Sequence, residues 1–331
     1  MAEAKAEPRT QATSNWAYRT QHGDLIFWLL TLFFALVIIG LVVAVGVVTF
    51  GGSAEARERY GLSFLTNVEW NPIETDLFPA TYGAWPAMRG TLLSSLLALV
   101  LAAPTGVAIG VFLSELCPLR IRGPLGFTVE LLAAIPSVIY GLWGVAVFAP
   151  WFTTFVAVPI SESVGGAIPW LAGPVAVSRG LIVTGVILAI MILPTVAAIT
   201  RDVLQAVPNN QRDVMLSLGA TRWEVIWLSV LPYARAGIIG GIMLGLGRAL
   251  GETMAATMLI GNSTRIEESL FAPATTAAAL VASELPNAND TMHESALIYL
   301  ALVLFGITLF LNLIARYLVW QTSRGPAGAR A

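Results

Sequence analysis

The membrane character of this chain is decided by residues 25–50, which read LIFWLLTLFFALVIIGLVVAVGVVTF. This run contains no charged residue and exceeds the roughly 20 apolar residues that a helix needs to cross a bilayer. It is also too long for the core of a signal peptide and has no obvious cleavage site behind the polar residues 1–24. We therefore expect a transmembrane helix that stays in the protein, with residues 1–24 as a tail.

Five further runs are long and apolar enough to span a membrane. Residues 90–114, 180–200 and 295–315 carry no charge, whereas residues 124–150 contain Glu130 and residues 236–261 contain Arg248 and Glu252. Residues 159–179 are interrupted by glycine and proline, which favours a surface or re-entrant loop. The sequence predicts an all-α polytopic membrane protein with six transmembrane helices.

Composition excludes several classes of function. Hydrophobic residues make up 56% of the chain and charged residues 11%, and the net charge of -2 provides no basic surface for nucleic acid. One cysteine and two histidines cannot form a metal cluster, so no metal or catalytic residue is expected. Lys5 is the only lysine, which rules out a phosphate-binding loop that ends in Gly-Lys-Ser/Thr. We expect no cofactor in this chain, and ATP with Mg²⁺ in a partner ATPase.

The distribution of basic residues predicts the orientation. If both termini are cytoplasmic, twelve of the eighteen Lys and Arg residues lie on that side, as the positive-inside rule requires. Residues 51–89 then form an external loop, residues 90–320 the transmembrane core, residues 201–235 a cytoplasmic loop and residues 321–331 a cytoplasmic tail.

The loop at residues 201–235 has the signals of two short helices. A helix is expected to start after Pro208 and to stop at Gly219, and Thr221 with Glu224 has the spacing of a capping box for a second helix, which should end near Leu231 and Pro232. The first helix would expose three apolar side chains that need a cover from a partner protein. These are Val214, Met215 and Leu218.

The fifth predicted span carries two charged residues inside the membrane, where charged residues usually have a functional role. An unpaired arginine at this depth costs at least about 2.5 kcal/mol, so Arg248 should pair with Glu252, which lies one helical turn away. Gly237, Gly241 and Gly245 share their helix face and should allow a second helix to approach closely. Since guanidinium groups bind oxyanions with two parallel hydrogen bonds, we expect Arg248 to contact an anionic substrate and Glu252 to act as its counter-ion. A purely structural ion pair that locks two helices remains the alternative.

The cytoplasmic loop resembles that of the permease subunits of ABC importers. That family has the pattern Glu-Ala-Ala, three residues, Gly, nine residues, Ile, one residue, Leu-Pro. Here the positions read Asp213-Val214-Met215, Gly219, Ser229 and Leu231-Pro232, so Asp213 replaces Glu and Ser229 replaces Ile. The resemblance implies that residues 209–219 form a coupling helix that docks on an ATPase subunit.

Four other stretches extend the resemblance to the permeases of phosphate importers. They are LSFLTNVEWNP (62–72), RGTLLSSLLALVLAAPTGVAIGVFLSEL (89–116), ELLAAIPSVIYGLWG (130–144) and GGIMLGLGRALGETMA (240–255). The resemblance implies a type I ABC importer permease core of the MetI-like kind in the inner membrane of a bacterium. It also implies three partners: a homologous permease, PstA, two copies of an ATPase, PstB, and a phosphate-binding protein, PstS.

Two other functions stay open on the residues alone. A permease for sulfate or molybdate would share the loop and the arginine. A secondary transporter or channel would instead use Arg248, Glu252 and Glu130 as an ion path that needs no ATPase. A membrane-anchored enzyme is disfavoured because the two widely separated histidines offer no nucleophile with a base.

Overall fold

The computed structural model describes residues 14–74, 79–172, 178–288 and 290–323, which are mainly helical. The contacts divide the chain into two units, residues 1–51 and residues 52–331, and each is described by itself. The described part of the first unit belongs to one helix, α1 (Ser14–Gly52). Its side chains between Gly23 and Phe50 are almost all exposed, as expected for a helix surrounded by lipid or by partner helices.

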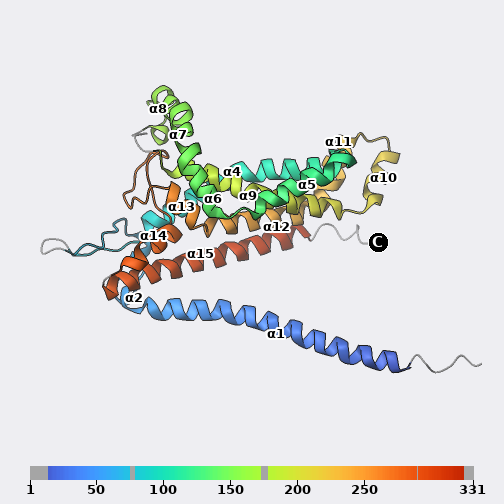
Figure 1. The fold of residues 1–331 in the computed structure, drawn as a ribbon, viewed down its shortest axis with the longest axis horizontal. Helices are drawn as coiled ribbons and strands as arrows, with labels where there is room; N and C mark the ends of the chain where they lie inside the picture. The colour runs from blue at the N-terminus through green and yellow to red at the C-terminus, as the bar shows by residue number, and fades with distance from the viewer. Residues whose placement is uncertain (1–13, 75–78, 173–177, 289, 324–331) are drawn as a thin grey trace, which may run out of the picture. The chain divides into compact units, whose positions relative to one another are not determined.

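The second unit contains the remaining helices (Figure 1). In chain order they are α2 (Ala54–Tyr60), α3 (Ser63–Thr66), α4 (Trp85–Val111), α5 (Leu119–Ala134), α6 (Ser137–Trp143), α7 (Ala149–Phe152), α8 (Val158–Val164), α9 (Leu181–Gln205), α10 (Asn209–Ser217), α11 (Arg222–Val225), α12 (Leu231–Leu250), α13 (Met254–Leu259), α14 (Ala277–Glu284) and α15 (Thr291–Ser323). Short π-helical turns join several of them: η1 (Phe112–Leu116), η2 (Gly144–Phe148), η3 (Thr153–Ala157) and η5 (Ile226–Val230). Two 3₁₀ turns complete the set: η4 (Pro169–Leu171) and η6 (Leu285–Asn287).

Six helical stretches among the described residues are long and apolar enough to cross a membrane, which confirms the predicted polytopic all-α fold. They cover Gly23–Gly52, Trp85–Leu116, Ser137–Val164, Leu181–Gln205, Arg222–Leu250 and Thr291–Thr322. The first, second and sixth contain the predicted spans and extend them at both ends, and the fourth contains its predicted span except for Gly180. The third and fifth differ from prediction.

The third span begins later in the chain than predicted. The run 124–150 was expected to be one helix, but α5 ends at Ala134 and a new helix starts at Ser137. Pro136 explains the break, because a residue before proline is disfavoured in the helical region and Ile135 is extended here, at φ -65° and ψ 128°. The helical stretch then runs on to Val164, so residues 159–164 belong to this span and are not a loop. The rest of the predicted loop includes residues 173–177, which lie outside the described residues.

The fifth span begins earlier than predicted. The capping box at Thr221 and Glu224 is present, with the Thr221 Oγ1 accepting from the Glu224 N–H at 3.3 Å, but the helix that it opens does not end near Leu231 and Pro232. It continues through the π-helical turn η5 into α12, so Pro232 lies inside a continuous helical stretch and supplies no N–H to the turn before it. The connection between the fourth and fifth spans is consequently residues 206–221, shorter than the predicted loop.

Helix α9 forms the centre of the second unit. It packs against α4 on one side and α12 on another, and it has the largest buried share of the six stretches. Glycines in α4 make the first contact close: a Cβ on Gly106 would lie 2.9 Å from the Val196 Cβ, and one on Gly110 would lie 2.6 Å from the Thr200 Cβ. Small residues at such positions let helix backbones approach within a membrane.

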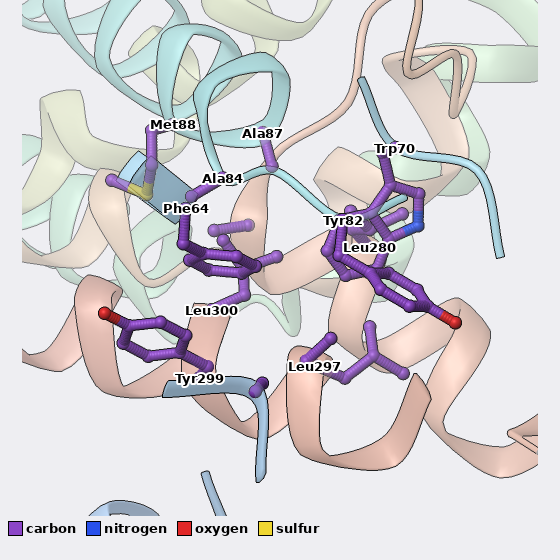
Figure 2. Close-up of a cluster of buried hydrophobic side chains, with 13 residues drawn as sticks. Phe64, Trp70, Tyr82, Ala84, Ala87, Met88, Leu280, Leu297, Tyr299 and Leu300 are labelled. Atoms are coloured by element: carbon purple, nitrogen blue, oxygen red, sulfur yellow. The ribbon is translucent and has the colours of Figure 1, made fainter. Parts of the chain in front are cut away.

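A cluster of buried aromatic side chains holds the segment between the first two spans against α15 (Figure 2). The Phe64 ring stacks on the Tyr299 ring with centroids 4.4 Å apart, and Tyr82 packs edge-on against Trp70 at 5.2 Å. The His293 Nε2 and the Glu284 Oε2 share a hydrogen bond at 2.9 Å, and the same oxygen accepts from the Trp70 indole N–H at 2.9 Å. The cluster lies at the end of the unit that carries α14.

The buried phenol of Tyr82 makes the contribution of this cluster to stability depend on pH. Burial, with a smaller contribution from the charge of Asp290, raises the pKa of Tyr82 from 10.0 to about 12. The neutral form is favoured in the folded state, so its contribution to stability is present below pH 10 and is lost as pH rises from 10 toward 12. We expect the tyrosinate absorbance of the folded protein to include a late-titrating component that decreases in Tyr82→Phe. Tyr317→Phe should leave the late-titrating component unchanged, because the Tyr317 side chain is exposed.

Candidate functional site

The glycine face of α12 packs against α9, as predicted. A Cβ added to Gly237, Gly241 or Gly245 would lie within 3.0 Å of Val203, Ile199 or Val196, respectively. The α12 residue number rises as the α9 number falls, so the two helices run antiparallel in close contact. This face is turned to protein, and Arg248 follows it along α12.

Arg248 lies deep within the helical unit. Its Nη1 donates to the Thr195 Oγ1 of α9 at 3.4 Å, and its side chain is half-buried. With a rise of 1.5 Å per residue, Thr195 is about 21 Å from the start of α9 and about 15 Å from its end. Arg248 is therefore at the depth of the bilayer interior, as the sequence predicts.

The ion pair expected between Arg248 and Glu252 is wrong for this structure. Helix α12 ends at Leu250, so the four-residue spacing does not place the two side chains on one helical face. Glu252 Oε1 instead accepts from the Ala255 N–H at 3.1 Å, at the start of α13. Among the described residues, no carboxylate lies within ion-pair distance of Arg248.

The break at residues 251–253 lies inside the membrane-spanning part of the unit. The Leu259 carbonyl, at the end of α13, accepts from the Gly180 N–H at 3.0 Å, immediately before α9 begins. Residues 251–259 thus occupy the second half of a crossing that α12 begins. Discontinuous helices of this kind bind substrates and ions in transporters, because they expose backbone groups at mid-membrane depth.

A second break faces the first. Helix α6, which follows the interruption at Pro136, packs on α13: a Cβ on Gly141 would meet the Met258 Sδ at 2.8 Å and the Ala255 Cα at 3.1 Å. The Tyr140 hydroxyl donates to the Leu132 carbonyl of α5 at 2.9 Å and so satisfies one orphan acceptor at the interruption. The packing of α6 on α13 thus links the segments that follow the two breaks, an arrangement that sequence periodicity did not predict.

Glu130 has a different partner from the one that its position in the sequence suggested. Its place about two turns inside the cytoplasmic end of the predicted third span suggests Arg122 or Arg120 as a partner, but its Oε1 accepts from the Arg201 Nη2 of α9 at 2.8 Å. Arg201 also binds Asp202 at 2.8 Å. This link joins α5 to α9 near the end of the unit that carries α10, away from Arg248.

The predicted helix between spans four and five is present as α10, and Gly219 follows it in the left-handed region at φ 85°. Val214 and Leu218 are exposed, with 58% and 78% of their surface accessible, as predicted. Met215 is different, because it packs against a buried cluster that includes Leu204 and Val225. The exposed apolar strip is therefore narrower than expected.

The remaining loop residues lie around α10 and at the start of α12. Asp213 is exposed on α10, whereas Leu231 and Pro232 belong to the first turn of α12. Sequence reasoning missed Arg212, whose guanidinium forms two bonds to the Glu115 carboxylate. These residues are 97 positions apart, so no local pattern could have paired them.

Comparison with known proteins assigns the family. A family model described as "Binding-protein-dependent transport system inner membrane component" matches residues 106–323. The phosphate transport system permease protein PstC of Mesorhizobium japonicum is 46% identical over 301 residues, which cover 90% of each chain. The protein of the same name from Pasteurella multocida is 42% identical and covers 96% of this chain and 97% of its own.

The fold is also found in a solved ABC transporter. A chain in the crystal structure of a bacterial alginate ABC transporter, in complex with an alginate pentasaccharide-bound periplasmic protein, superposes with a TM-score of 0.55 at 16% identity. The match covers 88% of this chain and 95% of that one, so the likeness in fold extends over most of this chain. The chain belongs to the binding-protein-dependent transport system inner membrane components and, among them, to the family of phosphate transport system permease proteins PstC.

Proposed function

We propose that this chain is the membrane permease subunit of an ATP-driven importer of inorganic phosphate and forms half of the translocation path. The names of its close relatives support this substrate, and the membership of the ABC permease family supports the energy source. The observation that carries the proposal is Arg248, a guanidinium at mid-membrane depth beside a helix break and without a carboxylate partner among the described residues.

The proposed path exploits that unpaired charge. An arginine in the bilayer interior is unfavourable by at least about 2.5 kcal/mol, so an arriving oxyanion that neutralises it recovers this energy. The planar donors of the guanidinium match two phosphate oxygens. Glu252 lies at the break and holds the start of α13 through Ala255, so in this proposal it shapes the path beside Arg248.

The energy for transport is proposed to come from outside this chain. Lys5 is the only lysine in the sequence and no phosphate-binding loop can be built around it, so ATP and Mg²⁺ would bind in two copies of the ATPase PstB. The exposed apolar side chains of α10, with Asp213 and the turn at Gly219, would form the docking surface for the ATPase. Leu231 and Pro232 would fix the position at which the chain continues from this loop into α12. The homologous permease PstA would complete the path, and PstS would deliver phosphate.

Orientation follows from the same proposal. Docking on an ATPase requires α10 to face the cytoplasm, which agrees with the excess of basic residues on that side and puts both termini in the cytoplasm. The aromatic cluster around Phe64 and Tyr299 would then face outward, where PstS arrives. The membrane would be the bacterial inner membrane.

Uptake by vesicles that contain the assembled four-component complex tests the proposal. We expect labelled phosphate to accumulate only with hydrolysable ATP and with PstS, and tenfold excesses of sulfate or molybdate to leave uptake unchanged. Displacement by either competitor would assign a different oxyanion. Accumulation without ATP hydrolysis, driven by an ion gradient, would support a secondary transporter instead.

A further inference from the structure

A partly buried ion pair joins the predicted docking helix to the second span. Arg212 of α10 binds Glu115 of η1 through Nη2 to Oε1 at 2.7 Å and through Nε to Oε2 at 3.1 Å. Their side chains are only 19% and 10% exposed. A two-bond contact between a guanidinium and a carboxylate fixes orientation as well as distance, because rotation of either group breaks a bond.

The same guanidinium binds the end of the fourth span. Its Nη1 donates to the Val207 carbonyl at 2.7 Å, and its Nη2 donates to the Leu204 carbonyl at 2.9 Å. These carbonyls belong to the last turn of α9 and the residues after it, where intrahelical donors run out. One side chain thus ties α10 to the ends of two spans.

Glu115 is held equally firmly on its own side. The Ser114 hydroxyl donates to the Glu115 Oε1 at 2.9 Å, and Arg122 of α5 donates to the Ser114 carbonyl at 2.7 Å. Hydrogen bonding to Glu115, against the opposing effect of burial, raises the pKa of the Arg212 guanidinium above its ordinary value. Arg212 therefore remains charged at every physiological pH.

Helix α10 has few other attachments. None of its residues is buried; α10 touches η5 and α11, Met215 packs against the cluster of Leu204 and Val225, and the Gln211 carbonyl accepts from the Ser229 hydroxyl at 3.2 Å. A push on the exposed side of α10 would reach η1 and the end of α9 directly through the Arg212 guanidinium. On the far side of the pair, α4 packs closely on α9 at Gly106 and Gly110, and α9 binds Arg248 through Thr195.

We propose that the Arg212–Glu115 pair is the positioning joint through which movement of α10 reaches the second span and, by way of α9, the surroundings of Arg248. The proposal rests on the proposed function, in which an ATPase moves α10. A rigid joint makes α10, η1 and α4 move as one body. Without the ion pair, α10 moves with the ATPase but the membrane spans do not move with α10, so ATP is hydrolysed without transport.

The ratio of phosphate imported to ATP hydrolysed tests the joint in the assembled complex. Arg212→Gln and Glu115→Gln each leave one partly buried charge without its partner, and we expect each to lower the ratio by about tenfold. Arg212→Lys keeps the charge without the second bond and should give an intermediate ratio. The exchange Arg212→Glu with Glu115→Arg should recover part of the loss. Arg120→Gln is the matched control, because Arg120 is exposed nearby and lies outside this contact network.

A role in folding alone would give a different pattern. It would reduce the amount of complex that copurifies with the ATPase, and uptake and hydrolysis would fall together at a constant ratio. An unchanged ratio in Arg212→Gln, or an equal fall in Arg120→Gln, would overturn the proposal.

A distance measurement separates this proposal from the proposed function. Spin labels at exposed Ser217 of α10 and Phe112 of η1, in a Cys117→Ser background of the full complex, should give a narrow distance distribution. We expect Arg212→Gln to broaden it. If wild type imports no phosphate but the broadening occurs, the substrate assignment fails and the joint stands. If wild type imports phosphate and the distribution stays narrow in Arg212→Gln, the joint fails.

Discussion

Phosphate uptake should fall by about 100-fold or more in Arg248→Gln, a loss typical of removing one preorganised group that stabilises a developing contact with an oxyanion. Arg248 has only a long hydrogen bond to Thr195 and no carboxylate within ion-pair distance among the described residues. The unit therefore loses little packing when the charge is removed, whereas the anion loses its principal attraction. Uptake by vesicles with the assembled complex measures the effect, and copurification of the partners measures assembly.

Three further variants make the Arg248 result specific. Arg248→Lys keeps the positive charge but offers a point charge in place of a planar fork, so uptake should be intermediate. Glu252→Gln should reduce uptake less than Arg248→Gln, because its amide oxygen still accepts from the Ala255 N–H. Arg316→Gln, at an exposed position of α15, is the matched control and should behave as wild type. Full uptake in Arg248→Gln with normal assembly would reduce Arg248 to a packing role.

The spans that sequence periodicity predicted well are those without internal breaks. Residues 180–200 and 295–315 carry no charge, and the helices found there, Leu181–Gln205 and Thr291–Ser323, cover them except for Gly180 and extend at most eight residues beyond them. Hydrophobic length alone defines such helices, because the bilayer demands that every backbone group be bonded within the segment. The predicted docking helix after Pro208 was also located correctly, since both of its ends have strong local signals.

The errors came from interrupted helices. The expected pairing of Arg248 with Glu252 assumed an unbroken helix, yet the chain leaves the helix at Gly251 and starts α13 with Glu252 as an acceptor. Such an interruption is stabilised by neighbouring elements, here the packing of α6 on α13, which a single stretch of sequence does not contain. The Arg212 and Glu115 pair escaped prediction for the same reason. The resemblance to phosphate-importer permeases identified the family correctly but carried no information on these contacts.

Gly90→Ala should destabilise the second unit by about 3 kcal/mol, at the upper end of what overpacking usually costs. A Cβ on Gly90 of α4 would lie 1.9 Å from the Thr275 carbonyl oxygen and 2.9 Å from its carbon. These are backbone atoms directly before α14, so no side-chain rotation can relieve the clash. Either α14 or α4 must move.

That movement would also break a buried hydrogen bond. The Ala277 N–H, at the start of α14, donates to the Thr91 Oγ1 at 2.9 Å, and both residues are almost fully buried. Separation of α4 from α14 leaves a donor without a partner, which adds to the loss because water does not replace it there. Detergent-induced unfolding of the complex, followed by tryptophan fluorescence, measures the change. Gly306→Ala in α15 is the control, since a Cβ there meets nothing within 4 Å and alanine favours the helix. Equal stability of the two variants would show that α14 yields freely, and the α14 end of the unit would then be a soft element able to move during transport.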